Sequence, residues 1–181
     1  MQQFPPSYQK PSSDLIYHIY RGGLFSRDAR ITVENKQEQL FHVEFPLSLF
    51  GSWSVTIHWG ANKNGPIAMT ISKPIFSWDF DIIDHTTNFR TSLIKTGFFS
   101  RKHSFMGPDG RQYAWKGSGF GGNLKLVAYP EKVQVGYYER AMFSFMKEGK
   151  LVISPQVHHM INLIIATGFA VEEWEREQRN S

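Results

Sequence analysis

The first chemically suggestive feature of the sequence is a stretch rich in basic side chains, from Thr86 to Lys132. It holds eight Lys or Arg residues and two acids, a balance of +6, whereas the whole chain is +4 and the remainder therefore sums to −2. Basic side chains that share one outer face of neighbouring strands can contact phosphate groups. The alternative is that strand exteriors carry Lys and Arg for solubility and edge protection. The candidate phosphate-contacting residues are Arg101, Lys102, Arg111 and Lys116.

A second feature is an acidic segment with three carboxylates and one imidazole, formed by Asp79, Asp81, Asp84 and His85. Oxygen ligands of this kind can hold a divalent cation, so a metal-dependent hydrolase that uses these four residues is the alternative function. However, the segment has neither the glycine nor the spacing of an EF-hand loop. Strand alternation also places Asp79 and Asp81 on one side, as an exposed polar face requires. We therefore predict no metal site here.

Other catalytic signatures are missing from the sequence. His158-His159 has no HExxH pattern and no i,i+4 partner, no GxSxG nucleophile elbow occurs, and the Gly-rich stretch 117–122 lacks the Lys-Ser/Thr of a phosphate loop. The chain contains no cysteine, which excludes disulfides, thiolate zinc sites, iron–sulfur clusters and a cysteine nucleophile. The aromatic residues alternate with polar neighbours, which favours core packing over stacking on bases. We expect no enzyme activity, no cofactor and no nucleic-acid partner.

The elements that must position these residues are short strands. From Asp14 to Ile153, runs of alternating apolar and polar residues are separated by Gly, Pro and Asn turn signals, a pattern that predicts roughly eleven or twelve strands. The chain is 41% hydrophobic and only 20% charged, which is sufficient for a packed core. No strand alternates with a long helix, which argues against a doubly wound α/β fold. The Asp109-Gly110 pair predicts a two-residue hairpin turn with a positive φ at Gly110.

One helix is predicted after Pro155, from Val157 to about Arg176. Its first fifteen residues, to Val171, are apolar on nearly every face, and such a helix must be buried on all sides. They are also fewer than the ~20 apolar residues that span a bilayer. Only the strands can surround this helix, so we predict a mainly β fold, a closed antiparallel barrel of about twelve strands around a central C-terminal helix. The polar end, EEWEREQRNS, is predicted to be solvated.

The two parts of the chain differ in composition. Residues 1–13 are rich in Pro, Gln and Ser and are predicted to form a disordered or loosely docked arm, whereas 14–181 form one domain. No secretory signal is recognisable, and neither a myristoylation site nor a prenylation site is present. The expected location is intracellular, in the cytoplasm or at a membrane surface.

The order of several segments resembles the tubby C-terminal-like superfamily, which includes tubby proteins, phospholipid scramblases and plant LURP-one-related proteins. The segments are DGRQYAWKG, NLKLVAY, LVIS and the apolar helix INLIIATGFAVEEWE. The resemblance covers about Leu15 to Trp174 and is nearest to a small fungal branch with a lone domain. It implies a twelve-stranded barrel around a central helix, no enzyme activity, phosphoinositide binding as in tubby and membrane association as in scramblases. The palmitoylated cysteines and acidic calcium segment of scramblases are missing here.

These observations together predict a non-enzymatic binding or scaffold module that binds anionic phospholipid or phosphoinositide. The expected partners are an anionic membrane surface and other proteins. Arg101 and Lys102 are adjacent, so a regular strand would point them to opposite faces, and both can face outward only at a bulge or a strand end.

Overall fold

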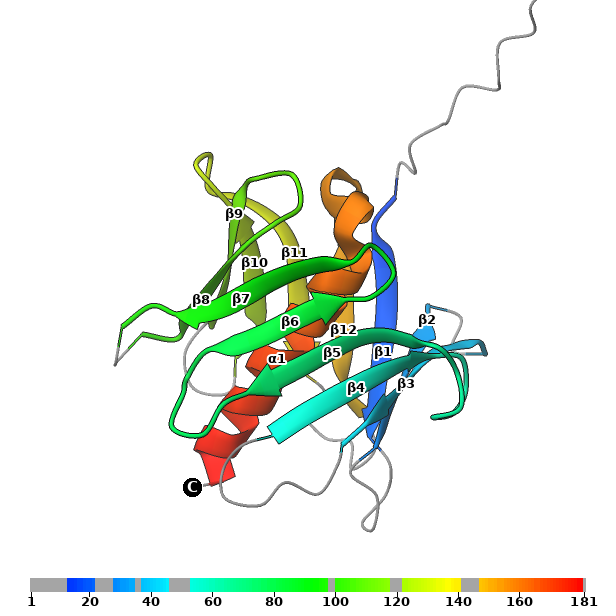
Figure 1. The fold of residues 1–181 in the computed structure, drawn as a ribbon. Helices are drawn as coiled ribbons and strands as arrows, with labels where there is room; N and C mark the ends of the chain where they lie inside the picture. Colours follow the sequence, from blue (N-terminus) through cyan, green and yellow to red (C-terminus); the bar gives the residue numbers. More distant parts are fainter. Residues whose placement is uncertain are drawn as a thin grey trace, which may run out of the picture.

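The computed structural model describes residues 13–21, 28–34, 37–45, 53–97, 100–117, 122–140 and 147–180. Within these residues twelve antiparallel strands form one closed barrel, in which each strand pairs with its neighbours in sequence and β1 also pairs with β12 (Figure 1). The predicted barrel is therefore confirmed. The strands are β1 (Leu15–Arg21), β2 (Ala29–Val33), β3 (Gln39–Glu44), β4 (Trp53–Trp59), β5 (Ile67–Lys73), β6 (Phe80–Asp84), β7 (Phe89–Lys95), β8 (Lys102–Met106), β9 (Gln112–Gly117), β10 (Leu124–Ala128), β11 (Val133–Arg140) and β12 (Lys147–Ile153).

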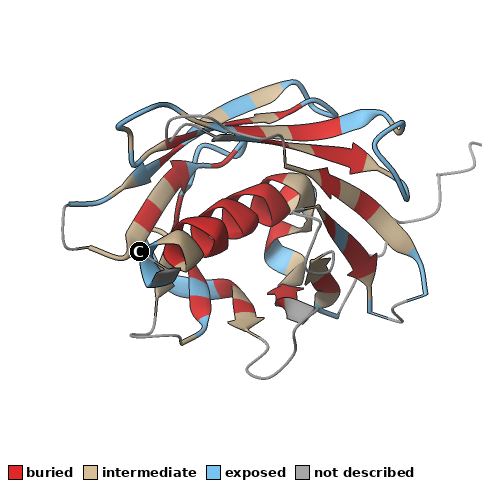
Figure 2. Ribbon diagram, turned by 90° about the horizontal axis from the view of Figure 1, so that it is seen from below, coloured by how far each residue is buried: buried red, intermediate tan, exposed pale blue. Residues whose placement is uncertain are grey.

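The predicted central helix is also confirmed. A short 3-10 helix, η1 (Pro155–Met160), leads into α1 (Ile161–Asn180), and α1 lies inside the barrel with most of its length buried (Figure 2). The sequence predicts burial of Ile161, Ile164, Ile165 and Phe169. The last three are buried, whereas Ile161, the first residue of α1, is only partly buried. None of the helices in the described part of the chain is long and apolar enough to cross a membrane. The apolar character of α1 is therefore used for packing against the strands.

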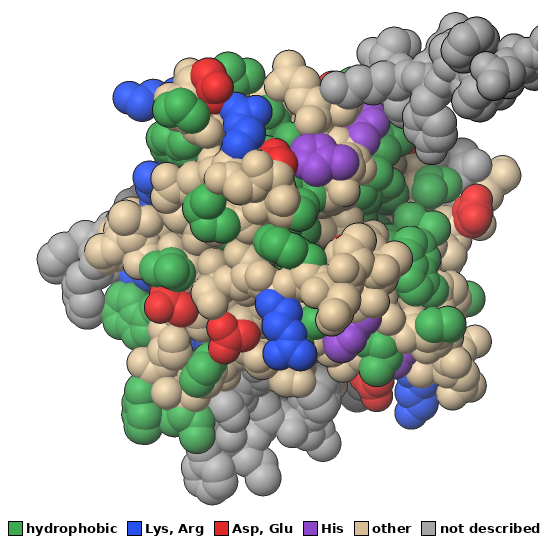
Figure 3. Space-filling view, turned by 45° about the horizontal axis from the view of Figure 1, so that its top comes forward, with side chains coloured by type: hydrophobic (Ala, Val, Ile, Leu, Met, Phe, Trp, Pro, Cys, Tyr) green, Lys and Arg blue, Asp and Glu red, His purple; other side chains and the backbone are tan. Residues whose placement is uncertain are grey.

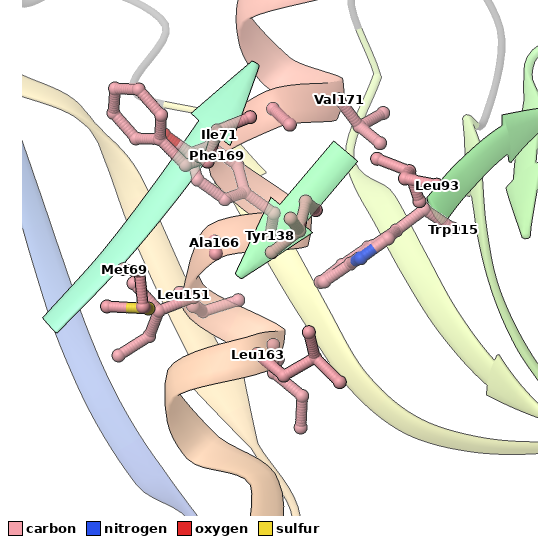
Figure 4. Packing of buried hydrophobic residues seen from close by; sticks show 14 of the residues in the cluster. Met69, Ile71, Leu93, Trp115, Tyr138, Leu151, Leu163, Ala166, Phe169 and Val171 are labelled. Carbon is pink, nitrogen blue, oxygen red and sulfur yellow. The ribbon is translucent and has the colours of Figure 1, made fainter. Parts of the chain in front are cut away.

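The core lies between α1 and the inner faces of the strands (Figure 4). Trp115 of β9 is fully buried, and its Nε1 donates a 2.9 Å hydrogen bond to Oγ1 of Thr167 on α1. A Cβ on Gly168 would lie 3.0 Å from Cζ2 of the same tryptophan. Gly168 therefore allows α1 to approach Trp115 closely. This contact explains why a residue of low helix propensity occurs in the middle of the helix.

The two ends of the barrel can be distinguished by the direction of α1. The N-terminal mouth is the end at which α1 begins, where Nε2 of His159 lies 3.3 Å from Asp109 in the β8–β9 loop. The C-terminal mouth is the end at which α1 finishes, where Glu172 meets Arg140 at the end of β11. Because the strands alternate in direction, β5, β7 and β9 end at the C-terminal mouth, and β6, β8 and β10 begin there.

The predicted solvation of the polar helix end is wrong for three glutamates. Glu172, Glu173 and Glu175 are buried, because arginines from two distant strands reach them inside the C-terminal mouth. Arg140 donates from Nε to Glu172 (2.6 Å) and from Nη2 to Glu175 (2.7 Å), and Arg21 of β1 pairs with Glu173. Burial lowers the pKa of Arg140, but its pairing with the glutamates outweighs burial and the net shift is upward. A buried charge is tolerated when it is paired and hydrogen-bonded in this way.

The β8–β9 hairpin differs in length from the prediction. Met106 pairs with Gln112, and the amide of Gly107 donates to the carbonyl of Arg111 at 2.9 Å, so the loop has three residues rather than two. Gly110 has φ +75°, as predicted. A turn followed by one left-handed residue is the usual form of a three-residue hairpin. Of the other predicted segments, residues 1–12 of the arm and 118–121 of the Gly-rich stretch lie outside the described residues.

Candidate lipid-binding surface

Three lysines form a row across three adjacent strands at the C-terminal mouth. Lys116 of β9 lies directly opposite Lys102 of β8 on one side and directly opposite Lys125 of β10 on the other. Residues that are directly opposite in antiparallel strands project from the same face, and here this is the outer face, because the preceding Trp115 points into the core. None of the described carboxylates lies within ion-pair distance of these three lysines. We call Lys102, Lys116 and Lys125 the lysine row.

An aromatic ring completes the lysine row. The ammonium groups of Lys102 and Lys116 lie 4.8 and 5.3 Å from the ring centroid of Tyr129. Tyr129 follows the far end of β10, where its amide donates to the carbonyl of Gln112, so these two lysine side chains extend from the mouth along the outer wall of the barrel. Hydrogen bonding by Lys116, together with the positive charges of Lys102 and Lys116, holds the pKa of the Tyr129 hydroxyl below its usual range, although partial burial opposes this shift. The lowered pKa means that the local positive potential stabilises a negative charge on an oxygen atom. A phosphate oxygen placed there would experience the same potential.

The four candidate residues from the sequence do not all meet at this surface. Lys102 and Lys116 are brought together, whereas Arg111 lies at the N-terminal mouth and pairs with Glu131. Arg101 lies just before β8, which begins at Lys102. At such a strand end, the two adjacent side chains can both face outward. Arg101 also lies next to Gly117 at the end of β9. Lys125 belongs to the basic stretch but is not one of the four candidates, because its place opposite Lys116 depends on the strand register, which the sequence does not specify.

The three carboxylates of the acidic segment have different surroundings. Asp81 is exposed on the outer face of β6, whereas Asp84 is buried and receives hydrogen bonds from the amide of Thr86 (2.9 Å) and the hydroxyl of Thr87. Asp79 caps the end of β7 by accepting from the amide of Lys95 at 2.9 Å. The described residues contain no cluster of three or more side chains able to hold a metal ion. Asp79 and Asp84 thus have local structural roles.

A pocket lies between the β5–β6 loop and the end of α1 at the C-terminal mouth. It has a volume of about 290 Å³ and is lined by the β5–β6 loop, by Lys73 and by the last turns of α1, including Trp174. The ammonium of Lys95 lies 3.8 Å from the ring centroid of Trp78 and 4.8 Å from that of Trp174. The two tryptophans therefore hold Lys95 between them by cation–π contacts, which ties the β5–β6 loop to the end of the helix.

The opposite end of the molecule has a different surface. Figure 3 views the molecule with the N-terminal mouth turned forward, and there Lys, Arg, Asp, Glu and His side chains are interspersed among apolar and neutral ones. Arg111 and Glu131 at this end neutralise each other. On the face seen in Figure 3, basic side chains are thus mixed with acidic ones, unlike those of the lysine row.

Comparisons with known proteins identify the fold more closely than the function. Residues 25–177 match the model of a family described as "Family of unknown function (DUF6593)". The structure is similar to the X-ray structure of a protein from Arabidopsis thaliana, AT5G01750, with a TM-score of 0.62 and 13% sequence identity over 91% of this chain and 93% of that chain. No curated protein matches the sequence. At this identity the likeness establishes a shared barrel fold alone.

Proposed function

This chain belongs to the DUF6593 family of unknown function, and we propose that it is a non-enzymatic binding module that docks on anionic phospholipid surfaces. The lysine row at the C-terminal mouth of the barrel makes the contact. Lys102, Lys116 and Lys125 bind the phosphates of lipid headgroups, and Tyr129 lies beside them. The resemblance of the sequence to the tubby C-terminal-like superfamily, whose members include lipid-binding proteins, supports the same choice of ligand.

The observation that carries this proposal is the register of the three lysines. Like charges directly opposite each other on neighbouring strands destabilise a sheet, and here two such pairs share Lys116. The absence of a described carboxylate partner leaves this repulsion in place in the free protein. An anionic surface removes the repulsion by placing phosphates between the ammonium groups. The repulsion that destabilises the free protein therefore adds to the free energy of binding.

The expected strength of this contact is modest. A basic side chain near an anionic membrane surface contributes ~1 kcal/mol, so the lysine row contributes roughly 3 kcal/mol, or about a hundredfold in partitioning. This is weaker than millimolar binding when it acts alone. The attraction falls with added salt, because the Debye length shortens from ~10 Å at 0.1 M to ~3 Å at 1 M ionic strength.

Co-sedimentation with vesicles tests the proposal. The protein is mixed with vesicles of phosphatidylcholine alone, or with phosphatidylserine or a phosphoinositide added at matched charge, at low and at physiological salt. The test variant combines Lys102→Ala, Lys116→Ala and Lys125→Ala. The control variant combines Lys63→Ala, Arg90→Ala and Lys132→Gly, which removes three exposed charges at the N-terminal mouth; glycine suits position 132, where φ is +60°.

The outcomes separate the activity from the site. We expect the wild type and the control variant to pellet with both anionic vesicles, and the lysine-row variant to lose about a hundredfold in partitioning. Equal and negligible pelleting of the wild type with anionic and neutral vesicles would reject lipid binding. Equal losses in the two variants would show that net charge alone matters and would reject the lysine row as the site.

A further inference from the structure

The β5–β6 loop at the C-terminal mouth exposes three large apolar side chains within four consecutive residues. Phe76 is 97% exposed, Ile75 48% and Trp78 40%. Elsewhere in the molecule, large apolar side chains are buried, and their burial stabilises the fold. Several large apolar side chains exposed side by side are typical of a surface that binds another protein or a membrane. We call residues 75–78 the apolar loop.

The backbone of the apolar loop places Phe76 outward despite an unfavourable conformation. The amide of Ser77 donates to the carbonyl of Pro74 at 3.2 Å, which closes a four-residue turn. Phe76 occupies its third position with φ +61°, where a turn of this kind normally has glycine because a Cβ is disfavoured there. Neither packing nor backbone preference accounts for a phenylalanine at this position.

The apolar loop is also held firmly at its base. Trp78 contacts the ammonium of Lys95, which in turn lies against Trp174 of α1. The Ser77 hydroxyl accepts a 3.0 Å hydrogen bond from the amide of Asp79, and the Asp79 carboxylate accepts from the amide of Lys95. These contacts fix the direction of the loop relative to the barrel. The tip of the loop therefore projects from the C-terminal mouth without having to order on binding, which saves conformational entropy.

We propose that the apolar loop inserts into the interfacial region of an anionic bilayer, with Phe76 deepest and Trp78 at the headgroup level. Lys73 and Lys95 end β5 and β7 at the same mouth as the lysine row, and Glu177 of α1 lines the pocket beside the loop. An anionic bilayer offers an apolar phase below a layer of phosphates and matches both features at once. Tryptophan is enriched at that depth because its ring is amphipathic. This inference rests on the proposed function and names the contact that adds affinity to the lysine row.

The substitution Phe76→Gly tests the insertion without endangering the fold. Glycine adopts a positive φ freely, so we expect the urea midpoint of the variant to stay the same or rise. Vesicle binding is expected to weaken about tenfold or more, because a buried aromatic side chain is lost, and the loss should persist at raised salt, where the lysine row is screened. The control is Ile67→Ala, which removes an exposed apolar side chain (47%, close to the 48% of Ile75) at the N-terminal mouth and should bind like the wild type.

Fluorescence quenching locates the loop directly. Vesicles of phosphatidylserine and phosphatidylcholine with brominated acyl chains should quench the tryptophan emission of the bound wild type. The variant Trp78→Phe should still bind but lose most of this quenching. Wild-type affinity of Phe76→Gly, or quenching that is unchanged in Trp78→Phe, would overturn the insertion.

The same measurements keep the two proposals apart. If the lysine-row variant loses binding while Phe76→Gly does not, the insertion fails and the proposed function stands. If Phe76→Gly loses binding while the lysine-row variant does not, the insertion stands and the lysine row is not the site. A wild type that pellets with none of the vesicles would overturn both.

Discussion

Acidification should destabilise this protein through one buried histidine, His103 of β8. The ring is fully buried on the inner face of the barrel, with its centroid 4.9 Å from that of Trp174 and 6.3 Å from that of Phe80. Neither ring nitrogen has a hydrogen-bond partner in the described structure. Burial, with a smaller contribution from the positive charge of Lys95, lowers the pKa of His103 from 6.5 to about 4. The folded protein therefore keeps this side chain neutral.

The sign and the size of the effect follow from that difference. The imidazole of His103 binds a proton less readily in the folded state than in the unfolded state. Its contribution to the free energy of unfolding is therefore fully present above pH 6.5 and is lost as the pH falls towards 4. Each pKa unit corresponds to about 1.4 kcal/mol. The lowered pKa of His103 therefore corresponds to a loss of about 3 kcal/mol from the free energy of unfolding between pH 7 and pH 4.

Urea denaturation, followed by tryptophan fluorescence at several pH values, measures this loss. Carboxylates titrate over part of the same range, so the wild type must be compared with His103→Leu, which cannot be protonated at this position. We expect the wild type to lose about 3 kcal/mol more than the variant between pH 7 and pH 4. Equal losses in the two proteins would refute the assignment of a neutral, buried imidazole.

Three further changes test the packing of the barrel, each by the free energy of unfolding in urea. Arg140→Ala removes the guanidinium that donates to both Glu172 and Glu175 and leaves them paired with the more exposed Arg179, so it should cost about 3 kcal/mol, the lower end of the range for breaking a buried ion pair; a cost below ~1 kcal/mol would show that solvent reaches the glutamates. Gly168→Ala should destabilise by about 1 kcal/mol despite its better helix propensity, because the new Cβ meets the pinned ring of Trp115 at 3.0 Å; a gain in stability would contradict this. Gly110→Val should cost roughly 1 kcal/mol or more at φ +75°, and an unchanged midpoint would argue against the turn.

The features that could be predicted from the sequence are those that depend on periodicity. Alternation over short runs indicated the strands, and a helix apolar on all faces had to lie where strands surround it. Both arguments use only neighbouring residues. Ile164 and Ile165 are accordingly buried as predicted.

The features that could not be predicted depend on contacts between distant residues. The burial of Glu173 requires Arg21, which is 152 residues away in the chain, and charged residues without a known partner are rightly expected in solvent. The lysine row depends on the register that sets Lys125 opposite Lys116. The exposure of Phe76 depends on a turn conformation that phenylalanine rarely adopts. In each case the sequence contains the residue but not its neighbour in space.

The measurement that tests the central claim most directly is the orientation of the barrel on an anionic bilayer. The chain has no cysteine, so a single nitroxide label can be placed by Ile75→Cys at the C-terminal mouth or by Asn64→Cys at the N-terminal mouth. Electron paramagnetic resonance then compares the accessibility of each label to oxygen, which enters the bilayer, and to a nickel chelate, which stays in water. On phosphatidylserine vesicles, the label at position 75 should gain oxygen and lose nickel accessibility, while the label at position 64 should remain in water. Bilayer insertion of the label at position 64, or two labels that both stay in water while the protein pellets, would contradict docking through the C-terminal mouth.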